Sequence, residues 1–151
     1  MTSGDPSSKL KPGYDIVFTV SDYFDGPVYG IANFQRKPHF YTRVFDEATD
    51  EYSDFYLLTP IDEEAFAVAM EDWAIWTRWK AAFHAGKTDL SSHPTLPQDR
   101  SRHDELRLIL DKTLVTDPIR SEKRIGKVEG LGHSELPKGV IRQLQVKWNE
   151  P

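Results

Sequence analysis

Hydrophobic and polar positions alternate along the chain from residue 14 onward, and this pattern predicts β-strands. Residues 14–20 alternate most regularly, and residues 28–34, 39–45 and 55–58 form three further strand-like segments. The connections between these segments are short, and the one over residues 46–53 is expected to be a polar loop. Short connections favour an antiparallel meander, because parallel neighbours need a crossover of about a dozen residues.

A long helix is predicted after these strands. Thr59 offers a hydroxyl for the N-cap, and Pro60 suits the first helical position. The helix is expected to end at about Ala85, because Gly86 can adopt the left-handed conformation that follows many helices. Its large apolar side chains are Phe66, Met70, Trp73, Trp76, Trp79 and Phe83.

The aromatic side chains of this helix have two interpretations. At about 100° per residue they cover more than one narrow stripe. The helix is therefore buried over a wide arc, or it leaves Trp73, Trp76 or Trp79 in a groove for a ligand or partner. The second interpretation is open because tryptophan is enriched at binding hot spots.

A second helix is predicted from about Leu96 to Leu114. It is expected to end before Asp117 and Pro118, because the residue before a proline is biased away from the helical region. Its apolar stripe consists of Leu106, Ile109, Leu110 and Leu114.

The last strand of the chain has the clearest pattern. Residues 143–148 alternate between apolar and polar side chains. Gly126, Gly130 and residues 137–139 interrupt the stretch before it. The predicted fold class is α+β, with an antiparallel sheet of five or six strands and two packed α-helices.

Length and composition limit the classes of protein to which the chain can belong. A chain of 151 residues suits one domain, so we expect a disordered tail over residues 1–13 and a single α+β domain over residues 14–151. The sequence has no cysteine, which excludes disulfides, thiolate nucleophiles and cysteine-based zinc sites, and fits a cytoplasmic protein. No apolar run approaches the ~20 residues of a membrane helix, so a soluble protein is expected.

Charge is distributed unevenly along the chain, whose net charge is −5. Residues 46–72 contain ten acidic residues and neither Lys nor Arg, whereas residues 118–147 contain seven basic residues and three acidic ones. This distribution has two interpretations. In the first, the two regions face each other or are simply solvated. In the second, the acidic region is a patch that binds a basic partner.

One connection between strands is a candidate binding loop. Residues 21–27 carry Asp22, Tyr23 and Asp25 together with a second aromatic residue, Phe24. Exposed loops of this kind often bind partners. The alternative is a hairpin turn whose aromatic side chains fold back onto the protein.

The candidate residues for acid–base catalysis are Asp72, Asp99 and His103. Asp72 lies beside the helical aromatic residues, where desolvation would raise its pKa and suit a general acid. Asp99 and His103 are four residues apart, so they can meet on one helix face. The histidines have no metal-binding spacing, and the segment Gly86–Thr88 lacks the glycine-rich turn that a phosphate-binding loop needs.

These observations favour a small non-enzymatic binding domain with an acidic patch and an aromatic-rich helix. The alternative is a metal-independent hydrolase or lyase that uses Asp and His. The expected partner is a basic protein or a small molecule, and the acidic net charge disfavours nucleic acid. We expect no cofactor, no metal and no membrane association, and the oligomeric state stays open.

Overall fold

The computed structural model describes residues 10–131 and 143–151, and it divides the chain into two compact units. The barrel unit contains the described residues 10–61, 115–131 and 143–151, and the helical unit contains residues 62–114. The expected tail spans residues 1–13, and its residues 1–9 lie outside the described residues. A single domain over residues 14–151 stays a prediction.

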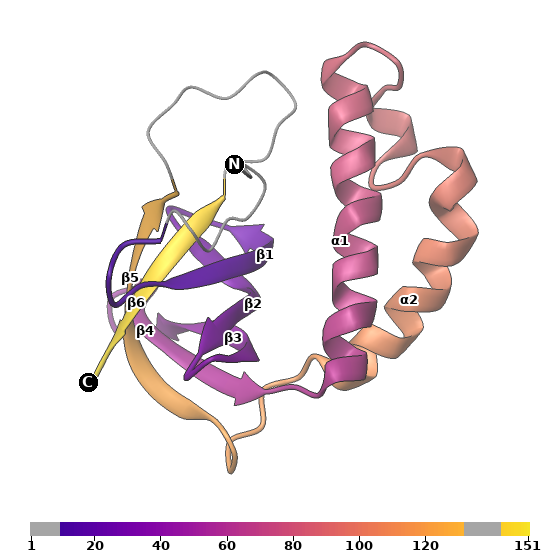
Figure 1. Ribbon diagram of the computed structural model, residues 1–151. Coiled ribbons are helices and arrows are strands. Elements are labelled where there is room, and N and C mark those ends of the chain that lie inside the picture. The colour runs from indigo at the N-terminus through magenta and orange to yellow at the C-terminus, as the bar shows by residue number, and fades with distance from the viewer. Residues whose placement is uncertain (1–9, 132–142) are drawn as a thin grey trace. The chain divides into compact units, whose positions relative to one another are not determined.

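The barrel unit is a closed sheet of six antiparallel strands (Figure 1). Each strand pairs with the next along the chain, and β1 also pairs with β6. An α+β protein with a six-stranded antiparallel sheet and two helices is therefore confirmed, but closure of the sheet was not predicted. The strands are β1 (Asp15–Tyr23), β2 (Pro27–Phe34), β3 (Lys37–Asp46), β4 (Glu51–Pro60), β5 (Glu122–Gly130) and β6 (Leu144–Asn149).

The interior of the barrel combines aliphatic side chains with hydrogen-bonded aromatic ones. Tyr41 and Tyr56 pack edge to face at 5.8 Å between ring centroids, and Trp148 packs in the same way on Tyr56 at 5.4 Å. The Tyr41 hydroxyl donates to the carbonyl oxygen of Thr19 at 2.8 Å, which satisfies a buried polar group. The buried core cluster consists of Val17, Ala32, Phe34, Tyr41, Tyr56, Leu58 and Val146.

Strand β5 shows why a glycine-containing segment was misread as an interruption. A Cβ atom at Gly126 would lie 2.8 Å from the ring of Tyr56 and 2.9 Å from the ring of Trp148. The glycine is therefore in the strand because two aromatic rings occupy the space of its side chain. The prediction of a break at Gly126 was wrong, and residues 137–139 lie outside the described residues.

Two hairpins are longer than the sequence pattern indicated. Strand β1 continues to Tyr23, so its turn to β2 contains only Phe24, Asp25 and Gly26. Strand β4 begins at Glu51, so the end of the expected polar loop belongs to the strand. The remaining turn spans residues 47–50, so polar side chains lie both on the strands and in the turns.

The helical unit consists of an antiparallel pair, α1 (Glu63–His84) and α2 (Arg100–Thr113), with the short 3₁₀ helices η2 (Leu90–Ser92) and η3 (Pro97–Asp99) between them. The N-cap of α1 is Asp62, whose carboxylate accepts a hydrogen bond from the Ala65 backbone at 2.7 Å. The predicted cap at Thr59 was wrong, because that residue still belongs to β4. Gly86 has a φ of +74°, as expected for the residue after the helix end.

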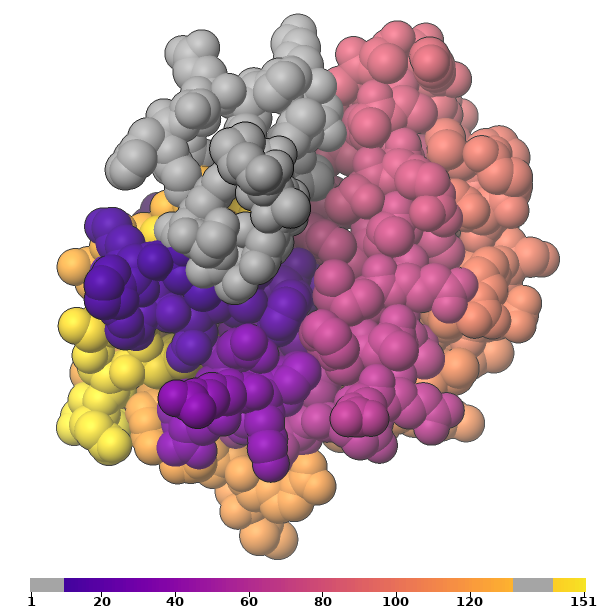
Figure 2. Space-filling view, in the orientation of Figure 1, coloured from indigo at the N-terminus to yellow at the C-terminus, as the bar shows by residue number. Residues whose placement is uncertain are grey.

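Packing between the helices uses part of the predicted apolar stripe. Leu106 and Leu110 of α2 are buried, as are Ile75 and Trp79 of α1, whereas Ile109 is exposed. In Figure 2 the atoms of α2 lie against those of α1. Neither helix, nor any other within the described part of the chain, combines the length and apolar character needed to cross a membrane.

Candidate functional site

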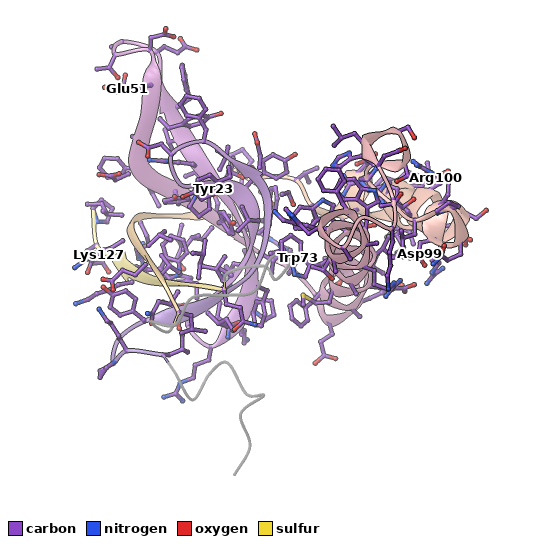
Figure 3. The ribbon with its side chains drawn as sticks, turned by 90° about the horizontal axis from the view of Figure 1, so that it is seen from above. Tyr23, Glu51, Trp73, Asp99, Arg100 and Lys127 are labelled. Carbon is purple, nitrogen blue, oxygen red and sulfur yellow. The ribbon has the colours of Figure 1, made fainter. Side chains whose placement is uncertain are left out.

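The ends of two neighbouring hairpins form an exposed aromatic and acidic surface on the barrel unit. The β1–β2 and β3–β4 turns lie at the same end of the barrel, because consecutive antiparallel strands reverse direction at each turn. Figure 3 labels Tyr23 at the end of β1 and Glu51 at the start of β4. We call this region the hairpin surface: Tyr23, Phe24, Phe45 and Tyr52, with Asp22, Asp25, Asp46, Glu47, Asp50, Glu51 and Asp54.

The aromatic side chains of the hairpin surface contact one another across the two hairpins. The rings of Phe24 and Tyr52 lie 6.1 Å apart, and those of Phe45 and Tyr52 lie 5.1 Å apart in an edge-to-face arrangement. Tyr23 is 64% exposed and Phe24 is 66% exposed. The expected alternative, in which the loop aromatics fold back onto the protein, therefore does not hold for Tyr23 and Phe24.

Arg43 ties the two hairpins together from β3. Its Nε donates to the carbonyl oxygen of Ser53 at 2.6 Å, and its Nη1 donates to the carbonyl oxygens of Phe24 and Asp25 at 3.2 and 3.3 Å. The guanidinium also lies over the Tyr52 ring at 5.7 Å from its centroid. One planar group with several donors thus sets the spacing of the two turns.

Most acids of the hairpin surface have no cationic partner. Among residues 10–131 and 143–151, the only ion pair at this surface joins Arg43 to Asp54 at 3.8 Å. Strand β4, which carries part of the acidic region, pairs directly with β5 of the basic region, but within the described residues no ion pair joins residues 46–54 to β5 or β6. The surface therefore keeps an unbalanced negative charge.

The acids of the helical unit differ, because several are paired with arginines between α1 and either η3 or α2. Glu71 accepts two hydrogen bonds from Arg102, at 2.6 and 2.8 Å, and these bonds lower the pKa of Glu71. Asp99 accepts two bonds of 3.1 Å from Arg78. Such pairs link the segments of the helical unit, whereas among the described residues Asp54 is the one acid of the hairpin surface with a cationic partner.

The structure changes the predicted partner of His103. Its Nδ1 lies 2.6 Å from the Asp72 carboxylate, whereas Asp99 is bonded to Arg78. The hypothesis that Asp99 and His103 pair was therefore wrong. Arg107 also approaches Asp72, at 3.6 Å, so the carboxylate bridges two turns of α2. A pattern within one helix could not show this contact, because its partners are 31 residues apart.

The three tryptophans of α1 have different surroundings. Trp79 is 4% exposed, and its Nε1 donates to the Ser92 hydroxyl at 2.7 Å. Trp73 and Trp76 are half-buried, and their ring centroids lie 4.9 Å apart. Lys80 lies over the Trp76 ring at 5.3 Å from its centroid. Trp79 is thus a core residue of the helical unit, and Trp73 and Trp76 keep part of their surface exposed.

Sequence reasoning found part of the hairpin surface and missed part of it. Asp22, Tyr23 and Asp25 were expected from the residue types of their loop, and all three are exposed. Phe45 and Tyr52 were assigned to a strand and a polar loop. The register of β3 and β4 pairs these two residues directly, and Tyr52 also contacts Phe24 of the other hairpin. No local signal would have identified Arg43 as the link between hairpins.

Cavities and metal-binding groups add no second site to the described part of the chain. A small apolar cavity inside the barrel is lined by side chains that include Tyr41, Tyr56 and Trp148. Within residues 10–131 and 143–151, no three His, Asp or Glu side chains come together as metal ligands would.

In comparisons with known proteins, the chain matches no family model, no curated protein and no solved structure.

Proposed function

We propose that the protein is a small non-enzymatic binding domain whose hairpin surface docks a basic segment of a protein partner. The observation that supports this proposal is the combination of exposed aromatic rings with acids that lack ion-pair partners among the described residues. Aromatic side chains at a surface are enriched at binding hot spots. Unbalanced acids beside them add attraction for a cationic partner and speed its association.

The chemistry of the surface favours lysine or arginine side chains. Their aliphatic parts can pack on Tyr23 and Phe24, while their charged ends reach Asp22, Asp25 or Glu51. An aromatic face can also attract the cation directly, as Tyr52 already does with Arg43 at 5.7 Å.

A protein segment fits this surface better than a small molecule does. Small-molecule sites are concave and largely enclosed, whereas most side chains of the hairpin surface are exposed at the ends of two hairpins. A cytoplasmic location belongs to the same proposal, and it rests on the absence of cysteine from the sequence.

A fluorescent peptide of alternating lysine and alanine tests the proposal by anisotropy. We expect binding that weakens strongly between about 0.05 and about 0.5 M salt, because exposed charges are screened over that range. A peptide with glutamate in place of lysine should not bind. The double variant Tyr23→Ser/Phe24→Ser should lower the affinity about tenfold, as loss of hot-spot aromatics does.

Two control variants separate the hairpin surface from general effects. Leu108→Ser removes an apolar side chain that is 69% exposed on α2, and it should leave peptide affinity unchanged. Asp50→Asn/Glu51→Gln should weaken binding, whereas Asp104→Asn/Glu64→Gln, in the helical unit, should not. If both double variants lose the same peptide affinity, only the net charge of the protein matters, and the proposal is rejected.

The contact between His103 and Asp72 supports a second candidate function. A carboxylate on one ring nitrogen orients an imidazole so that the other nitrogen can transfer a proton. With a separation of 2.6 Å and both side chains largely buried, the pair has this arrangement. The corresponding activity would be that of a metal-independent hydrolase or lyase, and Asp99 would have no part in it.

Turnover of ester, phosphoester and amide substrates tests this candidate. His103→Gln should abolish any activity found, and Asp72→Asn should reduce it while leaving His103 in place. Arg107→Gln is the structural control, because Arg107 also contacts Asp72 but donates no proton at neutral pH. Activity that survives His103→Gln would exclude the pair.

A further inference from the structure

The outer face of β5 and β6 carries lysines around a small apolar centre. Lys123, Ile125 and Lys127 share the face of β5 opposite to Gly126, which lies against the interior rings. Lys147 of β6 pairs with Lys127, and Phe55 of β4 pairs with Ile125. We call these five residues the lysine face, and Figure 3 labels Lys127 within it.

Two lysines of this face lie directly opposite each other on neighbouring strands. The register places Lys127 across from Lys147, and both are exposed. Like charges directly opposite in a sheet are destabilising. The negative group near Lys127 is Glu129 at 3.7 Å, but this carboxylate is already bonded to Lys11 at 2.5 Å. Within residues 10–131 and 143–151, Lys147 has no ion pair.

The lysine face and the hairpin surface have complementary chemistry. The first has Phe55 and Ile125 between lysines, with Lys123 over the Phe55 ring at 4.5 Å from its centroid. The second has exposed aromatic rings among acids. No ion pair joins the two surfaces within the described chain, so each is left with charge that an outside partner can balance.

We infer that the lysine face is the docking site for the hairpin surface of a second copy of this chain. This inference rests on the proposed function and names the basic partner as the protein itself. The contact is heterologous, because two different surfaces meet and each copy keeps one of them free. It predicts a series of oligomers that grows with concentration rather than one closed dimer.

Sedimentation equilibrium of the full chain tests the inference first. At about 0.05 M salt and protein concentrations up to about 1 mM, the average mass should rise above the monomer mass of 17.4 kDa. At about 0.5 M salt it should return to the monomer value, because the contact depends on exposed charges. A monomer mass at every concentration and both salt levels overturns the inference.

Two variants, each lacking one surface, test the geometry. Lys127→Gln/Lys147→Gln removes the facing lysines, and Asp22→Asn/Asp25→Asn/Asp50→Asn/Glu51→Gln neutralises the hairpin surface. Asparagine suits positions 25 and 50, where φ is +51° and +56°. Each variant alone should remain monomeric. An equimolar mixture should form a one-to-one complex, because each variant keeps the surface that the other lacks.

The control Lys37→Gln/Lys87→Gln has the same charge change at exposed positions outside the lysine face, and it should still associate. Association that persists in Lys127→Gln/Lys147→Gln overturns the inference. Binding of the lysine peptide to this variant separates the two proposals. If the variant binds the peptide and the wild-type chain does not self-associate, the inference fails and the binding function stands.

Discussion

Arg43 Nε donates a hydrogen bond of 2.6 Å to the carbonyl oxygen of Ser53, and this bond connects the two strands of the β3–β4 hairpin beside the β1–β2 turn. The same guanidinium donates to Phe24 and Asp25 in that turn. Its side chain is only 11% exposed. Water therefore has little access to replace these bonds, and the geometry of the hairpin surface depends on one side chain.

Replacing Arg43 by Lys should loosen both hairpins. Lysine keeps the charge but has no planar set of donors, so it cannot bond to both turns at once. We expect the free energy of unfolding to fall by about 2 kcal/mol and the affinity for the lysine peptide to fall with it. Urea denaturation provides the first measurement. Arg36→Lys, at an exposed position of the β2–β3 turn, should change neither quantity.

Gly30 should not tolerate a side chain. A Cβ atom there would lie 2.2 Å from the carbonyl oxygen of Thr19 and 2.7 Å from the Tyr41 hydroxyl. Gly30→Ala must therefore move a strand and break the bond between Tyr41 and Thr19, at a cost of about 3 kcal/mol or more. Thermal unfolding measures the loss. Gly86→Ala meets open space and is strained only by its φ of +74°, so its cost should be smaller, about 1–2 kcal/mol.

The buried hydroxyl of Thr95 should be dispensable. It has no hydrogen-bond partner among the described residues, although Thr95 is fully buried. Thr95→Val removes an unsatisfied polar group and keeps the shape, so it should stabilise the protein by about 1 kcal/mol. Thr59→Val is the matched control, because the Thr59 hydroxyl accepts from the Asp117 backbone at 3.2 Å. Destabilisation by Thr95→Val would show that this hydroxyl has a partner in solution.

Glu129 should titrate at unusually low pH. Hydrogen bonds from Lys11 and Tyr14 lower the pKa of Glu129 from 4.5 to about 2. Its contribution to stability is therefore complete above about pH 4.5 and is lost as the pH falls through 2. A carboxyl-carbon NMR titration measures the midpoint directly. Lys11→Gln should raise this midpoint toward 4.5, and Lys87→Gln should leave it unchanged.

Asp72 should matter more for the helical pair than an acid at a neighbouring exposed position. Asp72→Asn weakens contacts to both His103 and Arg107, and we expect a loss of about 1–2 kcal/mol in a partly buried site. Asp104→Asn changes an exposed acid beside His103 and should cost less than about 0.5 kcal/mol. Urea denaturation checks both values: the midpoints of the two variants are compared, provided that their unfolding curves have equal slopes. Equal costs would mean that the Asp72 contacts contribute little.

Local patterns were sufficient for most elements of the fold but not for the candidate surface. Strands β1 to β3 and β6 were predictable, because alternation reports which side chains share a face. Helix α1 ends before Gly86 as expected. Tyr23 was recognised as a candidate from its own loop. Phe45 and Tyr52 were not, since their proximity depends on strand register and on a turn whose length the pattern overestimated.

The sequence alone therefore determined the α+β class, both helices and most of the strands, because these depend on residues close together in the chain. Only the tertiary structure decided that β1 pairs with β6, that Gly126 belongs inside a strand, and that His103 meets Asp72. Each of these depends on which distant side chains occupy the same space. Packing and loop closure select such contacts among many alternatives, and no local periodicity records that choice.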